Sequence, residues 1–149
     1  MISHTDDRKT WMSLLAKTPG DALEACLAGL DDVPGAQLLR APEIGGVMVR
    51  GRMGGTGQPF NLGEMTVTRC SLRLAGGQVG HGYVQGRDKR AARCAALVDA
   101  LMQTDRAAEV RAAVLEPLAA ELSARSHARA ARAAATKVEF FTMVRGEDI

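Results

Sequence analysis

Residues 65–90, MTVTRCSLRLAGGQVGHGYVQGRDKR, decide the fold. The side chains at every second position from Thr66 to Leu74 share one face of a strand, and we expect that face to be buried. The sequence AGGQ at 75–78 then predicts a tight hairpin turn, because glycine accepts the positive φ angles that such turns require. A returning strand is predicted over residues 79–85, so this stretch forms an antiparallel pair.

A helix is predicted directly after this hairpin, with Asp88 as its N-cap. Arg87, Lys89 and Arg90 would then place three positive charges at a helix N-terminus, where the helix dipole favours anions. Two interpretations stay open. The cluster is either a solvated charged surface, or a site where a phosphate or an acidic partner offsets the unfavourable field.

The helix behind that cap has the clearest core face in the sequence, with apolar residues at helical spacing. They are Ala91, Cys94, Ala95, Val98, Leu101 and Met102. A face of this width predicts that the helix packs on the sheet.

Upstream, residues 52–60 read RMGGTGQPF and place three glycines between two β-patterned runs. Gly54, Gly55 and Gly57 can adopt positive φ angles and permit close approach of a backbone or a ligand. The segment lacks the Gly-Lys-Ser/Thr of a P-loop, and no helix follows it as in a dinucleotide-binding fingerprint. A turn that allows close backbone packing is the simpler interpretation; a phosphate-contacting loop with Arg52 is the other.

The N-terminal residues predict a helical hairpin. Residues 6–17 form an amphipathic first helix, and Pro19 suits the first position of a second helix capped by Thr18, with a stripe at Ala22, Cys26 and Leu30. From residue 37 the apolar period changes to two, so we expect an antiparallel meander of about four strands.

Residues 107–135 are helical in composition, and Pro117 predicts a break or kink. Val110, Val114, Leu118 and Leu122 form an apolar seam. Further along, Arg125, Arg129 and Arg132 form a basic stripe, which is either a solvated face or a partner site.

The C-terminal segment 138–144 is apolar and contains Phe140 and Phe141. Such a segment is expected to dock, either on its own domain or on another subunit, because exposed apolar patches usually mark interfaces. We treat both phenylalanines as candidate interface residues.

Composition bounds the function. The chain of 149 residues predicts a single domain spanning residues 1–149, and a net charge of +2 with 3% aromatic residues argues against nucleic-acid binding. No stretch approaches the apolar length of a membrane span. Cys26, Cys70 and Cys94 are an odd number without ligand spacing, which predicts free thiols in a cytoplasmic protein.

Candidate chemistry is sparse. His4, His81 and His127 are far apart in the sequence, and no metal-binding or nucleophile motif occurs. We therefore predict no catalytic residue, no cofactor and no metal site in this chain. For His81, flanked by glycines on a predicted strand, a structural or partner-facing role is the expectation.

Several motifs in one order along the chain resemble the PhnG family, subunits of the bacterial carbon–phosphorus lyase system. They are WMSL at 11–14, RMGGTG at 52–57, TVTR at 66–69, GRDK at 86–89, AALVDALM at 95–102 and VEFFTMVRG at 138–146. The resemblance covers nearly the whole chain.

That resemblance implies a non-catalytic core subunit. In the family's system, PhnG assembles with PhnH, PhnI and PhnJ into a symmetric complex that holds two copies of PhnG and is joined by PhnK and PhnL. PhnI carries the nucleosidase-type activity, and with PhnL the system displaces the base of ATP or GTP by methylphosphonate. The product is α-D-ribose 1-methylphosphonate 5-triphosphate, from which PhnJ later cleaves the carbon–phosphorus bond by iron–sulfur radical chemistry.

The expected fold is α+β: an N-terminal helical hairpin, an antiparallel meander, and C-terminal helices packed on the sheet. Two functions remain from the sequence. One is an assembly subunit of the phosphonate-processing complex. The other is an autonomous phosphate- or nucleotide-binding enzyme that uses Arg52, the glycine loop, Arg87 and Lys89.

Overall fold

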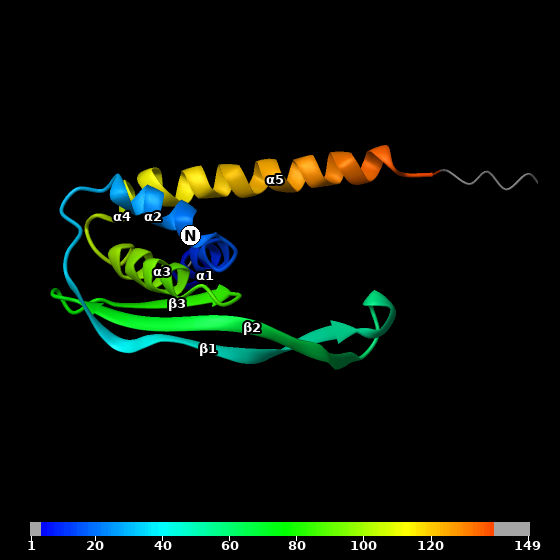
Figure 1. The fold of residues 1–149 in the computed structure, drawn as a ribbon, viewed down its shortest axis with the longest axis horizontal. Coiled ribbons are helices and arrows are strands. Elements are labelled where there is room, and N and C mark those ends of the chain that lie inside the picture. The colour runs from blue at the N-terminus through cyan, green and yellow to red at the C-terminus, as the bar shows by residue number, and fades with distance from the viewer. Residues whose placement is uncertain (1–3, 139–149) are drawn as a thin grey trace, which may run out of the picture.

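The computed structural model describes residues 4–138, and it has the expected α+β architecture. A sheet forms one side of the molecule, α3 and α1 lie over one of its faces, and α2, α4 and α5 lie beyond them (Figure 1). The core is shared between the covered sheet face and these helices.

The sheet contains three antiparallel strands in the order β1-β2-β3: β1 (Ala36–Arg52), β2 (Pro59–Leu74) and β3 (Val79–Gln85). We expected about four strands, with alternating runs at residues 37–40 and from residue 47 onward. The structure has one continuous β1 instead, with register shifts between Leu38 and Arg40 and between Arg40 and Glu43. Bulges on an edge strand absorb the proline, which cannot donate to a ladder.

The hairpin predicted at residues 75–78 is present. Gly77 has a φ of 93°, and the Leu74 N–H donates to the Gln78 carbonyl oxygen at 2.9 Å. The predicted core face of β2 is confirmed as well, since Thr68, Cys70, Leu72 and Leu74 are all buried.

Helix α3 (Lys89–Leu101) lies directly on β3. A Cβ added at Gly82 would overlap the carbonyl oxygen of Ala92, and one added at Gly80 would overlap that of Ala96. Glycine on the strand and alanine on the helix therefore bring the two backbones unusually close. The predicted face of α3 is confirmed, but the buried surface is wider and includes Asp99.

The helical hairpin consists of α1 (His4–Leu15) and α2 (Gly20–Ala28). Thr18 does not cap α2: its hydroxyl donates to the Leu14 carbonyl oxygen at 2.9 Å and ends α1. The buried side chains of α2 are Leu23 and Leu27, one residue beyond the predicted Ala22 and Cys26, whereas Leu30 after the helix is buried as predicted.

The C-terminal helices are α4 (Ala107–Val110), a π-helical turn η2 (Arg111–Leu115) and α5 (Glu116–Ala135). The irregularity predicted at Pro117 lies just before it, where the Glu116 N–H donates to the Arg111 carbonyl oxygen five residues back. A π-turn accommodates a helix residue without an N–H. Within residues 4–138, none of the helices is both long enough and apolar enough to cross a bilayer.

Two parts of the chain extend beyond the helical body on the same side (Figure 1). We call residues 46–66 the arm; there β1 and β2 pair with each other beyond the end of β3. We call residues 123–138 the overhang; it comprises the last turns of α5 and the residues after them, and every residue in it is exposed.

Candidate interface surfaces

The arm carries large apolar side chains that its own domain leaves in water. None of its residues is buried, and Met53 and Leu62 are 71% and 66% exposed. The register places Met48 opposite Glu64 and Val47 opposite Met65, so apolar groups occur on both faces. A two-stranded ribbon of this kind is marginally stable alone in water, which identifies the arm as a surface that needs a partner.

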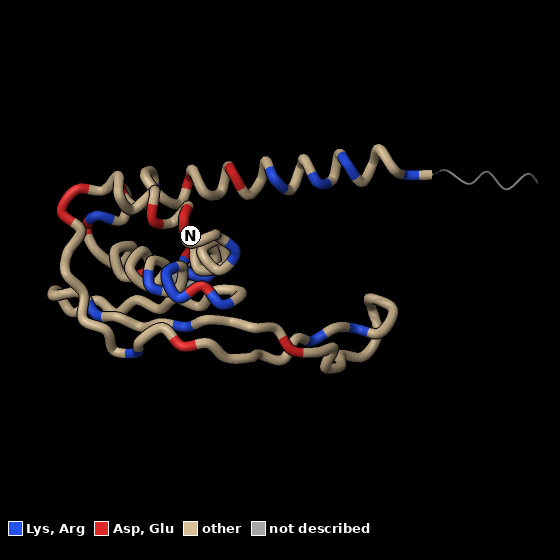
Figure 2. The backbone as a smooth tube through the Cα atoms, in the orientation of Figure 1, with Lys and Arg blue, Asp and Glu red and all other residues tan. Residues whose placement is uncertain are grey.

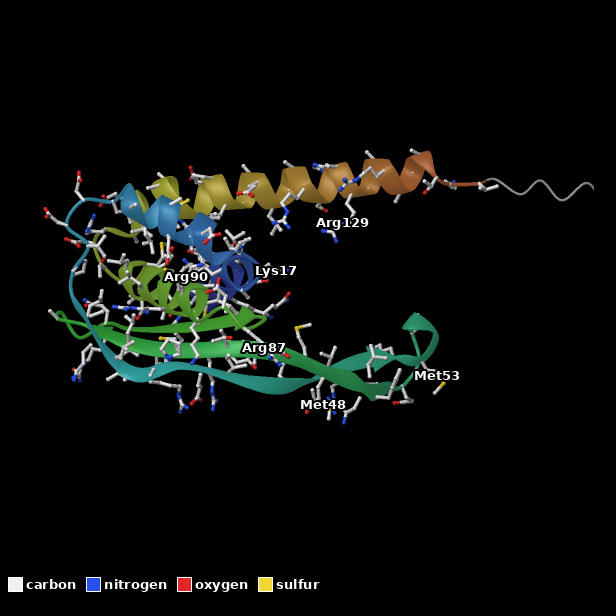
Figure 3. All side chains as sticks on the ribbon, in the orientation of Figure 1. Lys17, Met48, Met53, Arg87, Arg90 and Arg129 are labelled. Carbon is white, nitrogen blue, oxygen red and sulfur yellow. The ribbon has the colours of Figure 1, made fainter. Side chains whose placement is uncertain are left out.

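The glycine-rich segment forms the tip of the arm. Gly54 and Gly55 have φ angles of 59° and 83°, and a Cβ on Gly57 would lie 2.6 Å from the Met53 carbonyl oxygen. The Arg52 side chain donates to the Gly57 carbonyl oxygen at 3.1 Å. These contacts fit the simpler interpretation of a tight turn, and they present Met53 at the end of the arm (Figure 3).

The cations at the start of α3 have two different environments. Arg90 contacts Asp21 at 3.1 Å and Glu24 at 3.4 Å, both on α2. Arg87 and Lys89 are exposed, and neither forms an ion pair within the described part of the chain. Arg90 therefore has a partner inside this domain, whereas Arg87 and Lys89 are available to another molecule.

Asp88 begins α3 as predicted, because its carboxylate accepts from the Arg90 and Ala91 N–H groups at 2.9 and 3.0 Å. That local interaction satisfies the anion preference of the helix N-terminus without an external ligand.

The glycine loop and the Arg87–Lys89 pair do not form one site. The Gly86 N–H donates to the Thr66 carbonyl oxygen, whereas Arg52 lies opposite Pro59. Seven residues of extended strand separate Thr66 from Pro59, which corresponds to about 23 Å. A single phosphate could not contact both groups.

A buried carboxylate that sequence reasoning missed connects three elements. Asp99 of α3 is fully buried and accepts from Arg8 Nε at 3.0 Å, Arg8 Nη2 at 2.7 Å, Trp11 Nε1 at 3.0 Å and the His81 N–H at 2.8 Å. Hydrogen bonding to Asp99 raises the pKa of the Arg8 guanidinium above its ordinary value. These donors satisfy the carboxylate within the domain, so its role is structural. An acidic residue in an apolar helix face was the only signal for it.

His81 lies on the exposed, outer face of the sheet. Its Nδ1 is 2.9 Å from the Ser71 hydroxyl, while Asp99 contacts only the main-chain N–H of His81. A nucleophile, base and orienting acid are therefore not aligned there. Residues 4–138 also contain no cluster of three histidine, cysteine or acidic side chains placed to hold a metal ion.

A groove of about 600 Å³ runs between α1 and α5. Trp11, Leu14, Leu115 and Leu122 contribute apolar surface to it, and Lys17 and His127 line it as well. We call this the α1–α5 groove. The lining also includes Asp7, which pairs with Arg111 at 2.8 Å, and Glu116, so charges of both signs surround the apolar floor.

Comparisons with known proteins match nearly the whole chain. Residues 6–146 fit the model of a family described as phosphonate metabolism protein PhnG. A relative from Rhizobium meliloti strain 1021 is named alpha-D-ribose 1-methylphosphonate 5-triphosphate synthase subunit PhnG. It is 48% identical over 141 residues, which cover 95% of this chain and 90% of the relative. The resemblance of the ordered motifs is thereby confirmed.

Proposed function

The chain belongs to the PhnG family of phosphonate metabolism proteins, and from this membership we propose that it is a subunit of a multi-subunit synthase. The synthase would make α-D-ribose 1-methylphosphonate 5-triphosphate from ATP or GTP and methylphosphonate in phosphonate catabolism. The name of the Rhizobium relative supports this reaction.

Within that complex we assign the chain a non-catalytic, structural role. Its partners would be PhnI, PhnH and PhnJ, joined by PhnK and PhnL, with two copies of this chain in each cytoplasmic complex. The chain would hold no cofactor, and the nucleoside triphosphate would be a substrate of the assembly.

The observation that carries this proposal is the uncovered arm. Burying its large apolar side chains against a partner would gain on the order of 25 cal/mol for each Å² removed from water. An enzyme that worked as a monomer would leave this surface in water. The alternative enzyme function also loses its basis, because Arg52 and the glycine loop lie about 23 Å from the Gly86–Arg87 turn by strand length.

Co-expression with the other subunits tests the proposal. We expect a tag on this chain to recover PhnI, PhnH and PhnJ, with a mass by light scattering that corresponds to two copies of each. Changing Met48→Ser and Leu62→Ser should abolish recovery while leaving the isolated domain folded. The matched control is Leu38→Ser with Leu39→Ser, which alters exposed apolar residues (42% and 51% exposed) away from the arm.

Calorimetry with the isolated chain addresses the alternative function. We expect no nucleotide binding below millimolar concentrations; micromolar affinity would instead indicate an autonomous nucleotide-binding protein.

The candidate residues Phe140 and Phe141 lie outside the described residues. If they dock into a neighbouring subunit, changing both to Ala should abolish assembly and leave the melting transition of the isolated chain in place. Loss of that transition would place them in the chain's own core.

A further inference from the structure

One face of the continuous helical path α4–η2–α5 changes character along its length. Val110, Val114 and Leu118 are buried, and Leu122 is half-buried at the edge of the body. Arg125, Arg129 and Arg132 continue the same series at steps of three and four residues. At 100° per residue, positions 114 to 132 in this series stay within an arc of about 80°. The side of α5 that packs on the body therefore continues as a row of arginines, which we call the arginine seam.

The composition of the rest of the overhang sets the arginine seam apart. Apart from the arginines, the helical residues 123–135 are serine, histidine and alanine, with no carboxylate. Figure 2 shows this end of α5 with basic residues and no acidic ones. If these arginines served only to keep the helix in solution, they would not need to share one arc. Serine, histidine and alanine fill the rest of the helix surface.

The arginine seam begins where the α1–α5 groove opens. Leu122, Ser126 and His127 line the groove from α5, and Lys17 lines it from the end of α1. Figure 3 shows Arg129 on the side of α5 that faces the sheet, above Lys17. At 100° per residue, the groove-lining residues of α5 occupy the arc next to that of the seam, and the two surfaces meet at Leu122.

We infer that the α1–α5 groove and the arginine seam together bind one acidic segment of another synthase subunit, anchored by apolar side chains in the groove. Carboxylates on that segment would pair with the guanidinium groups of the seam, which suit bidentate contacts. Its apolar side chains would cover Leu14 and Leu122. This inference rests on the proposed function and identifies a second contact besides the arm.

Residues 139–149 lie outside the described residues, and the crosslinking experiment below distinguishes them from a partner segment as the occupant. A second copy offers poor charge complementarity, because the chain itself carries a net charge of +2.

A nucleic acid is also disfavoured as the occupant. The groove next to the seam is apolar, and only 3% of the residues are aromatic, which leaves few rings for base stacking.

Site-specific photo-crosslinking within the co-expressed complex tests the inference. The crosslinking residue p-benzoylphenylalanine replaces Ala119, which lines the groove, or, as the control, Ala124, which is exposed outside the groove about 140° around α5 from Ala119. We expect crosslinks from position 119 to an acidic stretch of another subunit and a weaker yield from position 124. Crosslinks to residues 139–149, to a second copy or to nothing would overturn the inference.

Competition for assembly tests the arginine seam. Wild-type and variant chains are co-expressed with limiting partners, and mass spectrometry of the purified complex gives their ratio. One variant changes the three seam arginines to Ala. The other keeps the net charge by moving them to the opposite arc, with the substitutions Arg125→Ala, Arg129→Ala, Arg132→Ala, Ala124→Arg, Ala131→Arg and Ala134→Arg.

Both variants should be incorporated roughly tenfold less than wild type, since rim charges set steering and specificity. Circular dichroism should show unchanged helix content in both. If either variant were incorporated as efficiently as the wild-type chain, the inference would be overturned while the proposed function stayed intact. Failure of the wild-type chain itself to assemble would overturn the proposed function, and the inference with it.

Discussion

At the scale of single residues, Gly82 controls the distance between α3 and the sheet. We predict that Gly82→Ala destabilises the domain by about 1–3 kcal/mol or more, because the new methyl group overlaps the Ala92 carbonyl oxygen and forces the helix away. Chemical denaturation of the isolated chain measures this loss as a lower midpoint.

The control is Gly45→Ala, at a strand glycine whose added Cβ would meet nothing within 4 Å. We expect its unfolding free energy to be unchanged or slightly raised, because alanine restricts the unfolded chain more than glycine does. Equal losses in the two variants would show that backbone freedom, rather than helix contact, requires glycine at position 82.

A second prediction concerns Asp99, whose buried carboxylate holds Arg8, Trp11 and the main chain of His81. Asp99→Asn keeps the shape but loses the charge and turns an amide N–H₂ toward donors. We expect a loss of about 2–4 kcal/mol of unfolding free energy, measured by denaturation. Asp105→Asn, at an exposed position, should cost less than about 0.5 kcal/mol. A near-neutral Asp99→Asn would show that the negative charge of Asp99 is not needed for stability.

The sequence predicts the role of a carboxylate such as Asp88 or Asp99 only when its hydrogen-bond partners are close to it in the chain. Asp88 was identifiable as a cap because it accepts from N–H groups two and three residues later. Asp99 was not, because its partners Arg8 and Trp11 lie 91 and 88 residues away in the chain. Likewise, the glycines flanking His81 indicated an unusual strand but not which helix they accommodate.

At the scale of elements, the arm and the three-stranded part of the sheet should differ in stability. We predict that main-chain amides in residues 46–66 of the isolated chain exchange at least about tenfold faster than those of β2 residues 67–73, which are paired on both sides. Hydrogen exchange with mass spectrometry resolves the two segments.

In the assembled complex the arm amides should become protected, because a partner removes the ribbon from water. Arm amides that exchange equally fast in the isolated chain and in the complex would argue against the arm as an interface.

The elements themselves were largely predictable, because periodicity and turn residues are local signals. The exceptions have physical reasons: bulges around Pro42 merged two expected strands into β1, and a π-turn before Pro117 preserved a helical path. Neither bulges nor π-turns leave a distinct pattern of apolar residues. The length of the arm was also hidden, because an exposed ribbon has the same alternation as a half-buried one.

At the scale of the whole molecule, the positive charges at the start of α3 serve two purposes. We expect Arg87 and Lys89 to contact a partner, whereas Arg90 pairs within its own chain. We predict that Arg87→Gln with Lys89→Gln weakens assembly, and that the wild-type interaction also weakens with added salt. The isolated variant should be as stable as wild type or slightly more so, because two charges that oppose the helix dipole are gone. Light scattering and thermal melts measure the two effects.

Arg90→Gln is the matched control, since Arg90 pairs with Asp21 and Glu24. It should cost the isolated chain about 0–1 kcal/mol, as exposed ion pairs do, and leave assembly unchanged. The opposite result, with Arg90 needed for assembly and Arg87 for stability, would reverse the assignment.

The candidate surfaces were less predictable than the fold. The sequence indicated Arg87, Lys89 and the glycine loop individually, but not that the latter lies at the far end of a ribbon. The groove depends on α1 and α5, which are about 100 residues apart, and local patterns contain no information on such pairs. Family resemblance supplied the function that geometry alone would have left open.

The two edges of the sheet have different capacities for growth. On the outer edge of β3, the His81 N–H donates to the Asp99 carboxylate, and the Gln85 N–H donates to the Ala16 carbonyl oxygen. The Val79 carbonyl oxygen accepts from the Gln103 side chain. The edge of β1 runs unbroken in register from Glu43 to Val49, and among the described residues no further strand pairs with it. Strand addition is therefore favoured at the β1 edge. Two chains paired through their β1 edges would leave no open β1 edge for a third chain, which disfavours growth of the sheet into a fibre.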